Sequence, residues 1–116
     1  MAFEMMRKLI QTGMTALLLA PALLVAQQDL RLIQAVNQQD EATFAVLLDQ
    51  GFDVRATEAD GTTALHWAVH RDQVKMAERL LASGAEVNAH NRYGVAPLSL
   101  AANNGNPALV ELLLRA

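Results

Sequence analysis

The stretch DGTTALHWAVHRDQVKMAERLLASGAEVNAH, residues 60–90, decides the fold because it is one unit of an internal repeat. A shift of 33 residues places Gly61 on Gly94 and Leu65 on Leu98. Agreement at one fixed spacing predicts a stack of equivalent units, each of which contacts mainly its neighbours. The other matched pairs are Gly51 with Gly84, Val54 with Val87, Ala56 with Ala89, Ala68 with Ala101 and Leu80 with Leu113, and Leu32, Ala35 and Leu47 extend the match backward.

Each unit is predicted to be a turn followed by two short antiparallel helices. Gly61 and Gly94 stand in the turns, where the backbone needs a positive φ angle that glycine adopts without steric cost. Thr63 is placed to cap the first helix through its hydroxyl, whereas Ala96 at the matching position has no hydroxyl. Pro97 falls in the first turn of the next helix, where its missing N–H is harmless.

The apolar residues of the two later units are expected to fill the space within and between the units, because no unit can bury its apolar face alone. Gly51 and Gly84 follow the second helices and indicate where those helices end. Leu65, Ala68, Leu98 and Ala101 are expected to face inward on the first helices, and Leu80, Leu81, Leu112 and Leu113 to lie between units on the second helices.

These units resemble ankyrin repeats, whose pattern runs D-x-x-G-x-T-P-L-H-x-A-A, then G-x-x-x-V-V-x-L-L-L, then G-A-D-V-N-A. Residues 60–90 resemble all three parts, with Ala64 in place of the proline and Asp72 in place of the glycine, and NRYGVAPLSLAANNGNPALVELLLRA (91–116) matches the first two. The unit 29–59 lacks the opening G-x-T-P-L-H, as expected of an N-terminal cap. The resemblance covers residues 29–116 and implies an all-α solenoid of about three helix-turn-helix units with β-turn or hairpin connections. The implied domains are a capping repeat at 27–57, a repeat at 58–90 and a repeat at 91–116 that is incomplete at its C-terminus.

The resemblance also assigns roles to individual residues. His66, in the motif TALH, is expected to hold the turns of adjacent units together by hydrogen bonds, and Ser99 takes its place in the third unit. Asp72 stands where the family usually has the glycine between helices, so this turn is expected to be strained. The third unit ends on ELLLRA with no polar capping helix, so its outer face is expected to be partly apolar. We interpret the chain as a fragment of a longer array or a C-terminally shortened protein, with a partner on that face as the alternative.

The first 26 residues have the layout of a secretory signal peptide. Arg7 and Lys8 precede an apolar run, residues 14–26, which polar residues follow, so cleavage is predicted between Ala26 and Gln27. The run reaches only about 20 Å as a helix, against about 30 Å of membrane hydrocarbon. This predicts a bacterial-type exported ankyrin repeat protein, periplasmic or secreted, that meets the membrane only transiently through its signal helix. An uncleaved membrane anchor and a misinterpreted core helix are the alternatives.

Composition excludes several classes of function. Beyond the front segment, 7 basic residues face 11 acidic ones, a net charge of −4 that argues against nucleic acid and anionic lipid as partners. The chain has no cysteine, which excludes disulfides and thiolate metal sites. His66, His70 and His90 with Asp60 or Glu58 could form a metal site, but the structural role of His66 is favoured and no metal is predicted. With no catalytic constellation visible, we predict no enzyme activity, no cofactor and no small-molecule substrate.

The predicted function is therefore binding of a protein partner. By resemblance, the binding face consists of the turn tips and the exposed side of the first helices. Its mixed polarity favours a protein surface or peptide. The alternative is a structural role in which uncapped repeats stack and the chain associates with itself. The candidate partner-binding residues are Ala59, Asp60, Thr62, His70, Arg71, Arg92, Tyr93, Val95, Asn103 and Asn104.

Overall fold

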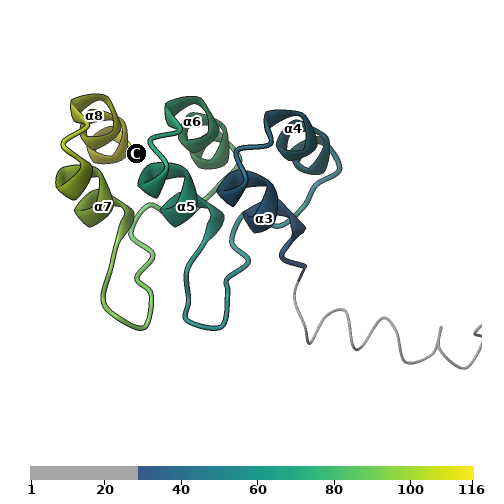
Figure 1. The fold of residues 1–116 in the computed structure, drawn as a ribbon, viewed down its shortest axis with the longest axis horizontal. Helices are drawn as coiled ribbons and strands as arrows, with labels where there is room; N and C mark the ends of the chain where they lie inside the picture. Colours follow the sequence, from purple (N-terminus) through teal and green to yellow (C-terminus); the bar gives the residue numbers. More distant parts are fainter. Residues whose placement is uncertain (1–28) are drawn as a thin grey trace, which may run out of the picture.

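A computed structural model of the chain describes residues 29–116, and the predicted signal peptide with its cleavage site lies outside this part (Figure 1). None of the helices between residues 29 and 116 is long and apolar enough to cross a membrane. The described helices are α3 (Arg31–Asn37), α4 (Glu41–Asp49), α5 (Ala64–His70), α6 (Val74–Ala82), α7 (Pro97–Asn104) and α8 (Pro107–Arg115).

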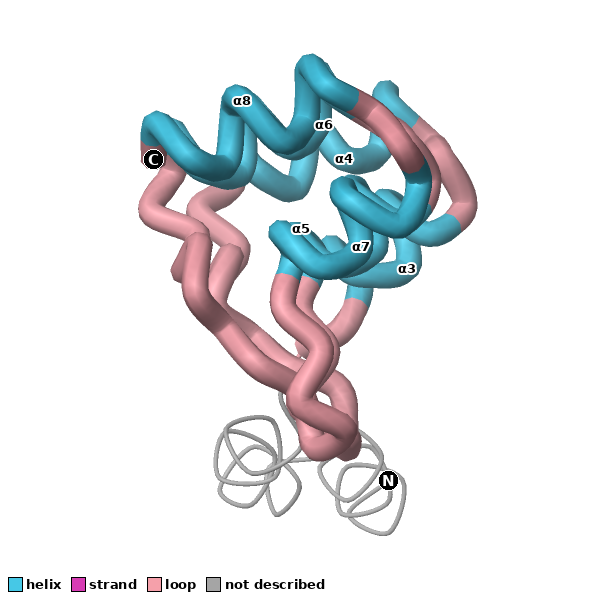
Figure 2. The backbone as a smooth tube through the Cα atoms, turned by 90° about the vertical axis from the view of Figure 1, so that its left-hand side faces the viewer, coloured by secondary structure: helices cyan, strands magenta, loops and turns pink. Residues whose placement is uncertain are grey.

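The helices form two layers, which confirms the predicted all-α stack of three helix-turn-helix units. Figure 1 shows α3, α5 and α7 in one row and α4, α6 and α8 in a second row. In the first row α5 packs against both α3 and α7. The long connections from α4 to α5 and from α6 to α7 project away from both layers (Figure 2). An isolated antiparallel bridge joins Thr57 and Thr63 across the first of these connections.

The start of α5 shows why the unit begins where it does. Thr63 has an extended backbone and its hydroxyl accepts a hydrogen bond from the backbone N–H of His66 at 3.3 Å. In return, the backbone N–H of Thr63 donates to Nδ1 of His66 at 3.1 Å, so the two residues form a capping box. At the matching start of α7, Ala96 makes no side-chain cap bond and Pro97 stands in the first turn, as predicted.

Left-handed residues shape both kinds of turn. Gly61 and Gly94 have φ angles of 87° and 75°, which confirms the predicted role of these glycines in the projecting turns. Between the two helices of each unit, the left-handed position is Gln39, Asp72 or Gly105, each 33 residues after the last. The φ angles of Gln39 and Asp72 are 58° and 56°, so the strain predicted at Asp72 is present in the first unit as well.

The buried core runs through all three units, and it corrects one sequence prediction. Leu65 and Ala68 on α5 and Ala101 on α7 are fully buried, as predicted. Leu98 was expected to face inward like Leu65, but 39% of its surface is exposed. The reason is position in the stack: α5 lies between two helices of its row, whereas α7 contacts α5 and α8 and has no described helix on its other side.

Candidate binding face

A set of hydrogen bonds between the second and third units fixes the two projecting turns relative to each other. Nδ1 of His66 lies 2.8 Å from the Thr63 hydroxyl and accepts the Thr63 N–H, so the ring carries its proton on Nε2. That nitrogen donates to the carbonyl oxygen of Val95 at 2.9 Å. The backbone N–H of Arg92 donates to the carbonyl oxygen of Asp60 at 2.6 Å. The predicted linking role of His66 is confirmed.

Side chains within the turns hold the tips in one conformation. The carboxylate of Asp60 accepts the N–H of Thr62 at 3.0 Å. The side-chain oxygen of Asn91 accepts the N–H groups of Tyr93 and Val95, both at 3.0 Å. Hydrogen bonds from the Thr62 side chain and backbone, with a smaller contribution from the Arg92 charge, lower the pKa of Asp60. Asp60 is therefore a fixed negative charge at neutral pH.

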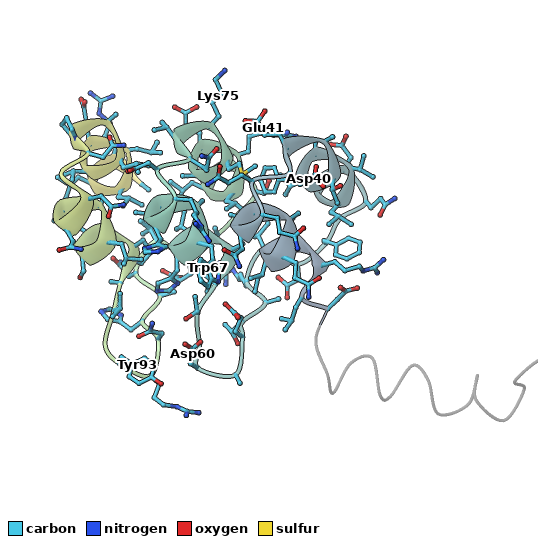
Figure 3. The ribbon with its side chains drawn as sticks, viewed as in Figure 1. Asp40, Glu41, Asp60, Trp67, Lys75 and Tyr93 are labelled. Atoms are coloured by element: carbon cyan, nitrogen blue, oxygen red, sulfur yellow. The ribbon has the colours of Figure 1, made fainter. Side chains whose placement is uncertain are left out.

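The structure places the predicted contact residues in four settings. Ala59, Arg92 and Tyr93 are exposed at the tips, and Figure 3 shows Tyr93 and Asp60 far from the helices. Asn103 is exposed on α7. The side chain of Arg71 donates to Oδ1 of Asn37 at 2.9 Å, and that of Asn104 donates to the carbonyl oxygen of Val69 at 3.0 Å. Arg71 and Asn104 therefore also tie neighbouring units together. The remaining four residues, Asp60, Thr62, His70 and Val95, line a cleft.

This cleft, with a volume of about 270 Å³, opens between the second and third units on the side of the first helices. Trp67 and Leu100, which are not among the predicted contact residues, line it as well. The indole is half-buried, and its Nε1 donates a hydrogen bond to the carboxylate of Glu58. The His70 ring meets the indole edge-to-face, with centroids 5.7 Å apart and planes at 77°.

The sequence itself indicated that aromatic side chains gather beside this cleft. His70 and Arg71 lie three and four residues after Trp67, a spacing that places them on the same side at the end of α5 as Trp67. That side is separate from the one buried through Leu65 and Ala68. The guanidinium of Arg71 lies 5.9 Å from the centre of the indole ring. Thus the same spacing that predicts the core also predicts an aromatic surface beside it.

The arrangement of the described side chains gives no support to a metal site built from the histidines. Among residues 29–116, no group of three His, Asp or Glu side chains is placed to hold a metal ion. Both ring nitrogens of His66 are occupied by the hydrogen bonds to Thr63 and Val95.

A comparison with known protein families agrees with the 33-residue period of the sequence and with the paired helices of the structure. The family model described as "Ankyrin repeats (3 copies)" matches residues 32–116. The chain belongs to the ankyrin repeat family. Ankyrin repeats are modules of protein–protein interaction that are typically non-catalytic, so this chain carries a protein-binding module.

Relatives that share these ankyrin repeats are much longer proteins. The potassium channel AKT1 of Oryza sativa subsp. indica is 38% identical over 81 residues, which cover 70% of this chain and 9% of the channel. The potassium channel AKT3 of Oryza sativa subsp. japonica is 41% identical over 73 residues, covering 62% of this chain and 8% of the channel. The putative ankyrin repeat protein L271 of Acanthamoeba polyphaga mimivirus is 34% identical over 67 residues, covering 58% of this chain and 9% of that protein. The chain therefore matches less than a tenth of the length of each of these relatives.

Proposed function

We propose that the turn tips and the exposed side of the first helices in the second and third repeats form the face that binds one protein partner. The observation that carries this proposal is Tyr93, which is 72% exposed at the end of a turn whose backbone is fixed by Asn91. Tyrosine and arginine are enriched among residues that dominate protein interfaces, and Arg92 stands next to Tyr93. A tip that is already ordered loses little conformational entropy on binding.

Photo-crosslinking tests this face directly. Benzoylphenylalanine in place of Tyr93 should cross-link to one partner protein in cells. The matched control carries the same group in place of Lys75, an exposed residue of α6 on the opposite side of the stack (Figure 3). Cross-linking from position 75 but not from position 93 would refute the proposed face.

The proposed location is the periplasm or the extracellular space. Support comes from the basic start, the apolar run at 14–26 and the abrupt change to polar residues at Gln27. Intact mass spectrometry of the protein isolated from its source should show a chain that begins at Gln27. A chain that begins at Met1 and sediments with membranes would support the uncleaved anchor, and a soluble chain beginning at Met1 would refute export.

A second candidate function, assembly through the third repeat, is favoured by the surface of α8. Leu114 is 67% exposed and lies with Val110 and Pro107 in an open hollow. Its counterpart one unit earlier, Leu81, is partly buried against the core. Analytical ultracentrifugation separates the candidates: self-association that is abolished by Leu114→Glu supports assembly, and a monomer at high concentration refutes it.

A further inference from the structure

The cleft between the second and third repeats combines an aromatic wall, an apolar wall and one fixed carboxylate. Trp67 and His70 of α5 form the first wall, and Leu100 of α7 contributes to the second. Asp60 stands on the side of the turn tips (Figure 3). Its side chain accepts hydrogen bonds from Thr62, and a carboxylate has about four acceptor sites. The carboxylate thus keeps the capacity to bind another donor.

We propose that this cleft receives a basic side chain, arginine or lysine, from an extended segment of the partner protein. This inference rests on the proposed function and names the chemistry that the binding face recognises. The aliphatic stem of such a side chain lies against Leu100, as long basic side chains do on apolar surfaces. The cationic head reaches Asp60, and the indole of Trp67 attracts it through its ring electrons. A volume of about 270 Å³ is room for one side chain rather than for a folded element.

The carboxylate that lines the cleft, together with the net negative charge of the domain, favours a cation as the occupant. Asp60 lines the cleft on the side of the turn tips, and the carboxylate of Glu58 accepts a hydrogen bond from the indole nitrogen of Trp67. Two guanidinium groups also lie nearby: Arg71 stands 5.9 Å from the centre of the indole ring, and the charge of Arg92 acts on Asp60. Their hydrogen bonds, from Arg71 to Asn37 and from Arg92 to the carbonyl oxygen of Ala59 at 3.4 Å, are made to neutral acceptors, so an incoming cation must compete with both charges. The excess of 11 acidic over 7 basic residues beyond the front segment steers a cationic segment toward the domain.

Peptide titration of the full chain tests the inference, because Trp67 is the only tryptophan and reports on the cleft through its fluorescence. The probes are blocked pentapeptides, acetyl-Gly-Ala-X-Ala-Gly-amide, in which X is arginine, lysine, leucine or glutamate. We expect a saturable change with the arginine and lysine peptides at millimolar concentrations and none with the glutamate peptide. No saturation by arginine up to about 10 mM, or equal affinity for leucine, would overturn the inference.

Two asparagine variants separate the role of Asp60 from general charge. Asp60→Asn keeps an oxygen that can accept the Thr62 N–H but loses the charge, so it should lower the affinity for the arginine peptide about tenfold. Asp49→Asn makes the same change of charge at an exposed residue at the end of α4, outside the cleft, and should leave affinity within about twofold. Equal effects of the two variants would overturn the inference. If Asp60→Asn leaves cross-linking of the partner through position 93 unchanged, the cleft inference falls while the proposed binding face stands.

Discussion

Replacing His66 with alanine removes the one side chain that links the turns of the second and third repeats while capping α5. The ring is 2% exposed, and its loss leaves the buried N–H of Thr63 without its acceptor. An unsatisfied buried polar group costs about 1–3 kcal/mol. The carbonyl oxygen of Val95 also loses its hydrogen bond of 2.9 Å, but Val95 is half-buried, so that oxygen can accept a hydrogen bond from water instead. We therefore expect a loss of about 2–4 kcal/mol in the free energy of unfolding.

The assay is urea denaturation of the full chain followed by circular dichroism, with thermal melting as a second measurement. For a domain of this size the loss corresponds to a fall of about 10–30 °C in melting temperature. Ser99→Ala is the matched control, because Ser99 occupies the same position of the third repeat and is exposed. It should change the free energy of unfolding by less than about 0.5 kcal/mol. A loss for His66→Ala no larger than that for Ser99→Ala would refute the linking role of the ring.

Three further predictions concern turns, caps and pH. Gln39→Gly should raise the free energy of unfolding by about 1 kcal/mol in the same urea assay, because an exposed glutamine is held at a φ of 58°; an unchanged or lower value would contradict the strain. Ala96→Thr should add the missing hydroxyl cap of α7 and stabilise by about 1 kcal/mol, whereas Ala96→Val, which has the same shape without the hydroxyl, should not. Hydrogen bonds from the side chain and backbone of Thr43 lower the pKa of Asp40 below its ordinary 3.8. Since the folded pKa is the lower one, this stabilisation is present above the unfolded pKa and is lost as the pH falls below about 4. In a series of melting temperatures measured against pH, the Asp40→Asn variant should lose less stability below about pH 4 than the unchanged protein does. An equally steep fall in both proteins would contradict the role of Asp40.

Residues whose environment is set inside one unit were predictable from the sequence. Gly61 and Gly94 adopt the positive φ angles expected of them. Thr63 caps α5 because the backbone N–H groups in the first turn of that helix have no partner within the helix and lie within reach of its hydroxyl. The fixed period supplied the rest of the architecture. A side chain that needs φ near +60° without being glycine, as at Asp72, was predictable because its position in the repeat is known.

Residues whose environment depends on a neighbouring unit were harder to predict. The repeat makes Leu98 equivalent to Leu65, yet the two differ in exposure because, among the helices of residues 29–116, only that of Leu65 has a first-row helix on both sides. Similarly, the bonds of Arg71 and Asn104 cross from one unit to the next, so no pattern within a unit indicates them. The role of Trp67 as a wall of the cleft depends on Leu100 across the unit boundary.

The one-sided packing of α7 has a consequence for the order in which the domain folds. Helices in the first row pack mainly against helices of their own or the adjacent repeat, and the side-chain bonds between units span 29 to 35 residues. Such short loops close quickly, and the second repeat, buried on both sides, is the natural nucleus from which order spreads outward. Amide hydrogen exchange should therefore be slowest in α5 and fastest in α8. Local unfolding would then begin in the third repeat, where Leu98 and Leu114 are exposed.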